Sequence, residues 1–373
     1  MIPLFRVFMH EDAVEASVKV LRSGYIGQGP VVEQFEKELS NYLDDNVVTT
    51  NSATSAAHLA FHMTKNYDTQ YRDEVLCTAL TCTATNWPVL ANGLKIKWVD
   101  IDPNTLNMDI DDLARKITNK TLAINIVHWG GYPIDYKKMY EALDKTDDAV
   151  YNYPSVIEDC AHAFGSTYEG SPLSNQGGYC IYSFQAIKHL TCGDGGALVL
   201  PHLSHVENAK LLRWYGIDRN TNSKDFRCEA DIREWGFKFH MNDISASIGL
   251  ANLKHIQKEV IDKHKDNAAY YYEKLQDIDG ITLLERKENR ESAYWIFSLL
   301  VDRKADFMKH MAECNIMVSQ VHERNDIHSC VLQYKSALPN LDATIDKVIS
   351  IPVGWWVTKE DREYIVDCIK KGW

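Results

Sequence analysis

One lysine, Lys188, stands in a run of apolar and small residues between the strand-like segment CIYSF and a cluster of glycines. Lysine is ordinarily solvated, because burying an unpaired ammonium group is costly or forces the amine to become neutral. A neutral amine is a nucleophile that can form a Schiff base with a carbonyl compound. The segment therefore indicates either a structural loop lysine or a catalytic lysine with a lowered pKa.

Two other segments carry groups that could act with such a lysine. IEDCAHAFG places Glu158 and Asp159 after a strand-like run, with His162 three positions beyond Asp159. NSATS, residues 51–55, combines small residues and hydroxyls where a helix is predicted to begin, and helix N-termini bind anions. Each segment alone is equally typical of solvated loop acids or an ordinary helix cap. Together, a lysine, an acid able to pair with a pyridinium nitrogen and a phosphate cradle are the requirements of a pyridoxal phosphate site.

The elements that must position these residues alternate along the chain. Continuous apolar runs typical of buried strands occur at 73–80, 95–102, 121–129, 155–160, 180–184 and 196–200, with helical patterns that include 30–43, 51–65 and 83–93. This alternation indicates a parallel sheet covered by helices on both faces. Ligands bind beyond the carboxyl ends of such strands. We therefore expect one pocket, ringed by residues 51–55, 81–85, 128–131, 159–162 and 183–188.

The pattern changes after about residue 240. Residues 242–276 form one long helical pattern, and less regular strands and helices follow it. A chain of 373 residues is long enough for two hydrophobic cores. We expect a large α/β domain over residues 1–240, including the N-terminal segment, and a small α+β domain over residues 241–373.

Composition excludes several other classes of protein. The formal net charge of −12 opposes non-specific nucleic-acid binding, which needs a basic surface. The nine cysteines and fourteen histidines show no zinc-site spacing, so no metal is expected. No G-x-G-x-x-G motif indicates a dinucleotide-binding dehydrogenase. The sequence shows no signal peptide and no membrane-spanning apolar run, so we expect a reduced, cytoplasmic protein.

Nearly the whole sequence resembles the DegT/DnrJ/EryC1/StrS family of sugar aminotransferases. The segments that carry the resemblance, in the family's order, are LRSGYIGQGPVVEQFEKEL, NSATSAAHLA, VDIDPNTLNMD, VHWGGYPID, IEDCAHAFGS, YSFQAIKHLTCGDGGALV, LLRWYGIDR and GFKFHMNDISASIGLANL. The resemblance implies fold type I of the pyridoxal phosphate enzymes. That fold has a large domain with a mostly parallel sheet sandwiched by helices and a smaller α+β C-terminal domain.

The resemblance also implies roles for the chemically active residues. Lys188 would hold pyridoxal phosphate as a Schiff base and later move a proton between substrate and cofactor. Asp159 would keep the pyridine nitrogen protonated, and His162 would contact the face of the ring.

The phosphate group would be bound by Ser183, Ala53 and Thr54. In this family the sites lie at a homodimer interface, where a G-x-N-x-R loop of the second subunit completes the phosphate pocket. Here that loop is GFKFHMND, so Lys238 and His240 replace the usual polar and basic pair. A lysine could still meet the phosphate as a point charge.

Two further segments depart from the family's pattern. Cys82, in LTCTATNW, stands where many relatives place an aromatic ring on the cofactor, although Trp87 could serve from a turn away. Late in the chain, SQVHERNDIHSC replaces the usual PLH segment. Its His322, Arg324 and His328 are candidate substrate contacts, or else part of a salt-bridged surface loop.

The reaction implied by the resemblance is a two-step transamination. An amino acid, L-glutamate by analogy, would give its amino group to the cofactor, and a keto-sugar would then accept it. The acceptor would be a nucleotide-linked 4-keto-6-deoxy or 3-keto sugar, used in aminosugar and surface polysaccharide biosynthesis. A non-nucleotide sugar acid of the octulosonate type stays open. Sugar dehydratases of the family carry histidine in place of Lys188, and a non-catalytic member would have no physical reason to keep this set of residues.

Overall fold

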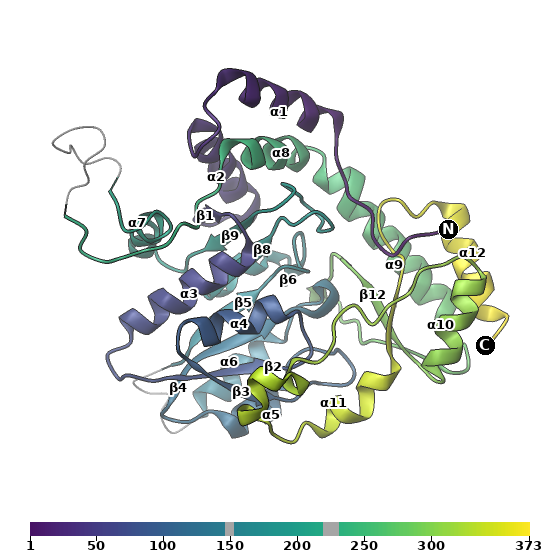
Figure 1. Ribbon diagram of the computed structural model, residues 1–373. Helices are drawn as coiled ribbons and strands as arrows, with labels where there is room; N and C mark the ends of the chain where they lie inside the picture. The colour runs from purple at the N-terminus through teal and green to yellow at the C-terminus, as the bar shows by residue number, and fades with distance from the viewer. Residues whose placement is uncertain (146–152, 219–230) are drawn as a thin grey trace.

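The computed structural model describes residues 1–145, 153–218 and 231–373 (Figure 1). Its centre is a seven-stranded sheet in the order β1-β9-β8-β5-β4-β2-β3. The strands are β1 (Val47–Thr50), β2 (Glu74–Thr78), β3 (Lys95–Val99), β4 (Thr121–Val127), β5 (Ser155–Asp159), β8 (Tyr179–Ser183) and β9 (Gly196–Val199). All seven residues of β4, at the middle of the sheet, are buried, as expected for a strand covered on both faces.

The prediction of a mostly parallel sheet is confirmed, with one correction. Strands β3, β2, β4, β5 and β8 are parallel to their neighbours, but β9 runs antiparallel to both β8 and β1. The apolar run at 196–200 gave no sign of this reversal. A parallel connection needs a crossover, usually a helix, whereas residues 184–195 contain no helix and lead straight back beside β8.

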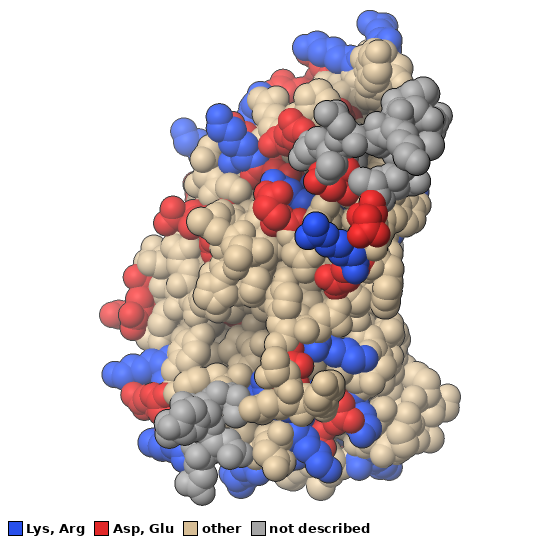
Figure 2. Space-filling view, turned by 90° about the vertical axis from the view of Figure 1, so that its left-hand side faces the viewer, with Lys and Arg blue, Asp and Glu red and all other residues tan. Residues whose placement is uncertain are grey.

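Helices cover both faces of the sheet (Figure 1). Helices α2 (Pro30–Leu43), α5 (Ile110–Lys116) and α6 (Tyr136–Asp144) contribute to one apolar core, and α3 (Ala53–Tyr67), α4 (Thr83–Ala91) and α7 (Leu203–Leu212) to the other. Helix α1 (Glu11–Ser23) packs against α8 (Asp243–Leu253) beyond the end of the sheet. On the face drawn in Figure 2, acidic and basic side chains are interspersed.

The C-terminal part has its own apolar core and a three-stranded antiparallel sheet. The strands are β10 (Ile281–Leu283), β12 (Phe297–Val301) and β13 (Val348–Ile351), and the helices are α9 (Asp262–Leu275), α10 (Lys304–Glu313), α11 (Pro339–Thr344) and α12 (Lys359–Lys370). A small third sheet joins β11 (Arg290–Glu291) to β6 (Thr167–Tyr168) and β7 (Ser171–Pro172). The predicted division at residues 240 and 241 stays a prediction.

The long helix expected over 242–276 is interrupted. Helix α8 ends at Leu253, and a π-helical turn at Gln257–Ile261 precedes α9. A π-helical turn bonds residues five apart and so shifts the helical register, which the polarity pattern does not reveal.

The N-terminal segment lies against the C-terminal part (Figure 1). Ile2 pairs with Ile316, and the backbone oxygen of Pro3 accepts a 2.9 Å hydrogen bond from Trp356 Nε1. Phe5 is thereby brought to the ring of Trp295, next to the segment that carries Lys188.

Candidate active site

Lys188 lies in the segment between the antiparallel strands β8 and β9. Its backbone N–H donates to Gln185 O at 2.9 Å, and its Nζ lies 3.4 Å from the centroid of the Trp295 ring. Burial lowers the pKa of Lys188 to about 8, although the charges of Asp159 and Cys82 act in the opposite direction. A large fraction of this amine is therefore neutral at mildly alkaline pH, as a nucleophile requires.

Asp159 ends β5 at the carboxyl edge of the sheet, and two donors orient its carboxylate. Oδ1 accepts from the backbone N–H of Ala161 at 2.9 Å, and Oδ2 accepts from Thr85 Oγ1 at 2.6 Å. Thr85 lies in the first turn of α4 and contacts Thr81 Oγ1 at 2.9 Å. The segments after β2 and β5 thus meet, as the sheet topology requires.

The neighbouring acid, Glu158, faces a different environment. Its side chain is fully buried and lies 3.0 Å from His128 Nε2, and Tyr136 also donates to it. Adjacent residues of a strand point to opposite faces, so Glu158 joins a buried polar cluster while Asp159 reaches the edge.

His162 and His322 form a pair of neutral imidazoles. The backbone N–H of Gly130 donates to His162 Nδ1 at 3.4 Å, so the ring proton of His162 is on Nε2. That atom lies 3.4 Å from His322 Nε2, and the two rings are nearly parallel, at 6°. Burial, and then the charge of Lys188, lowers the pKa of His162 well below its usual range and that of His322 to about 4. Neither ring therefore competes with Lys188 as a cation.

Three strands align the residues expected to bind phosphate. In the sheet register, Gly196 of β9 pairs with Thr50 of β1 on one side and with Ser183 of β8 on the other. A Cβ at Gly196 would lie 2.4 Å from the N atom of Ala53, so only glycine lets β9 pack directly against the start of α3. Ser52 caps that helix. The Ser183 hydroxyl and a helix N-terminus therefore share this edge, a suitable anion site.

The backbone of the GFKFHMND segment lies beside the same helix start. Asn51 N donates to Phe239 O at 2.7 Å, and Asn51 Nδ2 donates to Lys238 O at 3.3 Å. The Lys238 side chain is exposed, with Nζ 5.5 Å from the Trp214 ring. The ring of His240 packs on the same tryptophan at 3.6 Å. The contact of this segment with a second subunit stays a prediction.

Of the three candidate substrate residues, His322 lies at the site. Arg324 is engaged elsewhere: its Nε and Nη2 reach the two carboxylate oxygens of Asp326 at 2.7 Å each, and Nη1 also pairs with Asp342. His328 lies with its ring centroid 5.9 Å from that of Trp87.

Sequence analysis missed Trp295 entirely. An aromatic residue in SAYWIF, just before a strand, is typical of a hydrophobic core, and Trp295 is indeed buried. Only the fold shows that its ring faces the lysine of another segment. Thr85 fell within a segment expected at the pocket, but no role was predicted for it.

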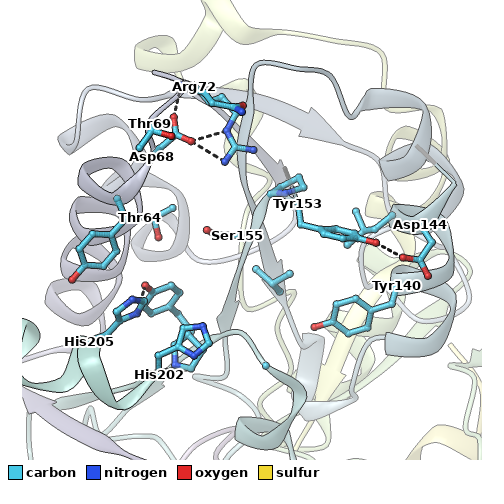
Figure 3. A pocket seen from close by; sticks show the side chains of 18 residues that line it. Thr64, Asp68, Thr69, Arg72, Tyr140, Asp144, Tyr153, Ser155, His202 and His205 are labelled. Atoms are coloured by element: carbon cyan, nitrogen blue, oxygen red, sulfur yellow. Dashed lines mark hydrogen bonds and ion pairs between the residues drawn. The ribbon is translucent and has the colours of Figure 1, made fainter. Parts of the chain in front are cut away.

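A cavity of about 660 Å³ lies away from this site (Figure 3). It is lined by the first residues of β5 and β8, at the amino-terminal edge of the parallel strands, and by His205. Arg72, at its rim, is ion-paired with Asp68 at 2.8 Å. None of the predicted site residues lines it.

Within the described part of the chain, no helix has the length and apolar character needed to cross a membrane. The eight described cysteines are free thiols.

The fold and the donor set together define a pyridoxal phosphate enzyme of fold type I. A half-neutral lysine, an oriented carboxylate, a hydroxyl and a helix N-terminus meet at one sheet edge and fit the cofactor's aldehyde, ring nitrogen and phosphate. The chain belongs to the DegT/DnrJ/EryC1/StrS aminotransferase family, whose sequence model matches residues 8–370. It is thus a pyridoxal phosphate-dependent sugar aminotransferase, which confirms the fold class, the family and the cofactor predicted above.

Individual relatives cover the whole chain. The crystal structure of AtS13 from Actinomadura melliaura is 46% identical, with a TM-score of 0.96, over 100% of this chain and 99% of that one. The sugar aminotransferase CalS13 from Micromonospora echinospora is 43% identical, with a TM-score of 0.95, over 100% of both chains. The UDP-4-amino-4-deoxy-L-arabinose–oxoglutarate aminotransferase of Shewanella sediminis is 27% identical, over 99% of this chain and 97% of the relative.

Proposed function

We propose that this enzyme transfers the amino group of L-glutamate to the keto group of a nucleotide-linked sugar, of the 4-keto-6-deoxy or 3-keto type, for aminosugar and surface polysaccharide biosynthesis. The observation that carries the transaminase chemistry is Lys188, with a pKa of about 8, beside the oriented carboxylate of Asp159. The name of the Shewanella sediminis relative supports both the oxoglutarate–glutamate pair and a nucleotide-linked sugar.

Each residue has a distinct task in this reaction. When bound, pyridoxal phosphate supplies an electron sink for the substrate carbon. Asp159, held by Ala161 and Thr85, stabilises a proton on the ring nitrogen. Lys188 takes and returns a proton as a general base and acid, for which a pKa near the working pH is favourable. His162 supplies a neutral ring beside the lysine.

The contacts of Arg324 favour the nucleotide-linked sugar over the sugar acid. A sugar acid carries a carboxylate, which would need a cationic partner. Arg324 already has two carboxylate partners, Asp326 and Asp342. Withdrawing it would leave Asp326, which is buried, without its ion pair.

The proposal is tested by the visible absorbance of the protein reconstituted with pyridoxal phosphate. The band of lysine-bound cofactor should appear, and it should disappear when L-glutamate is added. UDP-linked 4-keto and 3-keto sugars should then restore the band, whereas an octulosonate-type keto acid should not. If the band forms but no amino acid removes it, the proposed reaction is wrong.

We also propose that the enzyme is a homodimer joined in part through α1. Val14, Val18, Leu21 and Tyr25 are exposed and recur at the spacing of one helix face, opposite the face that buries Val20. An apolar stripe of this kind marks a protein interface. Sedimentation velocity should show a dimer for the native protein and a monomer for the Val18→Glu, Leu21→Glu double variant. A native monomer at micromolar concentration would contradict the proposal, and Glu15→Gln on the polar side of the helix is the matched control.

A further inference from the structure

Three consecutive residues of the lysine segment contact one short segment of the C-terminal part. The backbone oxygen of Ile187 accepts from Trp295 Nε1 at 2.9 Å, and Lys188 Nζ lies 3.4 Å from the centroid of the same ring. His189 Nε2 lies 3.1 Å from the backbone oxygen of Ala293, which can only accept, so this ring nitrogen carries the proton. The position of the lysine relative to Trp295 is thus fixed on both sides of residue 188.

The Trp295 ring is itself held from two other directions. Phe5 stacks on it at 5.1 Å between centroids and 22° between planes, and His162 does so at 4.1 Å and 26°. Phe5 comes from the N-terminal segment, and His162 from the loop after β5. Because Trp295 is also buried, its ring cannot move away from the lysine without breaking these contacts.

The face of an indole ring attracts a cation that lies within about 6 Å of its centroid. The attraction is strongest where water is excluded, and it acts on the ammonium form of lysine but not on the neutral amine. The Trp295 ring therefore opposes the effect of burial on Lys188.

We propose that Trp295 is a positioning residue that holds the free ammonium group of Lys188 beside the reacting centre whenever the lysine is not bonded to the cofactor. The inference rests on the proposed function, in which the lysine is released and rebound in each turnover. Without the ring, the released side chain would have several rotamers open to it and would have to find its working position again.

Several titratable groups surround the amine and stay in place when only the ring is changed. They are Asp159 at the end of β5, Cys82 at the start of α4, His162 after β5, His189 in the lysine segment and His322 in the 319–330 loop. A change in the titration of Lys188 after substitution of Trp295 therefore reports the ring.

The test is the titration of Lys188 in the cofactor-free protein. The protein is treated with acetic anhydride at a series of pH values, and the acetylated fraction of the Lys188 peptide is measured by mass spectrometry. The native midpoint should lie near pH 8. Trp295→Leu should lower the midpoint by about 0.5 to 1 pH unit, because the ammonium form loses its partner.

Trp295→Phe is the matched variant, since it keeps an aromatic face but loses the Nε1 bond to Ile187. Its midpoint should lie closer to the native value than that of Trp295→Leu. An unchanged midpoint in Trp295→Leu, or equal shifts in the two variants, would overturn the proposal. The titration needs neither cofactor nor sugar, so its outcome is independent of whether the proposed acceptor is correct.

Discussion

Replacing Lys188 with alanine is expected to reduce transamination by roughly 10³-fold or more and to abolish covalent attachment of the cofactor. The variant loses both the nucleophile that binds the aldehyde and the base that moves the substrate proton. After borohydride reduction of the loaded native protein, mass spectrometry should find the cofactor on the peptide that contains Lys188. The alanine variant should bind the cofactor without this bond, and its spectrum should change slowly, if at all, with L-glutamate.

Lys188→Arg separates the charge of the side chain from its chemistry. Arginine keeps a cation that can lie on the Trp295 ring, but it does not deprotonate in proteins and so cannot act as a nucleophile. Its activity should therefore be as low as that of the alanine variant. Added methylamine should raise the activity of Lys188→Ala in part, because a small amine fits the vacated space and can move the proton. If either variant kept a tenth of the native rate, another residue would be the catalytic base.

Local signals in the sequence predicted most elements well. The helix expected at 30–43 is α2, Pro30–Leu43, because proline at the first helical position and an amphipathic repeat both mark it. The residues that end strands were also placed correctly at one edge of the sheet. This follows from topology, since the carboxyl ends of parallel strands share an edge.

Contacts between distant segments lie beyond such reasoning. Thr85 donates to Asp159 across 74 positions of sequence, and Trp295 contacts the segment of Lys188 across more than a hundred. Threonine in a helix and tryptophan before a strand are ordinary there, so neither residue stood out. The engagement of Arg324 by two carboxylates likewise depends on a loop conformation that composition does not determine.

The site joins two parts of the chain with different tasks. The large sheet supplies Asp159, Ser183 and Lys188 from the ends of its strands, whereas Trp295 and His322 come from the C-terminal part. The lysine therefore titrates in an environment that exists only when both parts are packed together. A change at that junction should alter the chemistry of Lys188 even where no residue of the large sheet moves.

Asp159→Asn is expected to lower the rate of the half-reaction with L-glutamate by about 10² to 10³-fold while Lys188 still binds the cofactor covalently. Asparagine keeps the shape of the side chain and an acceptor for Thr85 and Ala161, so the fold should persist. It lacks the negative charge that favours a protonated ring nitrogen. Stopped-flow absorbance would show a normal starting band and a slow decay.

Thr85→Val removes one donor from the Asp159 carboxylate and leaves the charge in place. The expected loss is about tenfold, the cost of one hydrogen bond to a charged group. A cofactor analogue with a methylated ring nitrogen carries a permanent positive charge, so it should restore activity to Asp159→Asn. The same analogue should do little for Lys188→Ala, because the charge of the ring is not what that variant lacks. If it rescued neither variant, Asp159 would act through the structure of the β5 edge and not through the ring nitrogen.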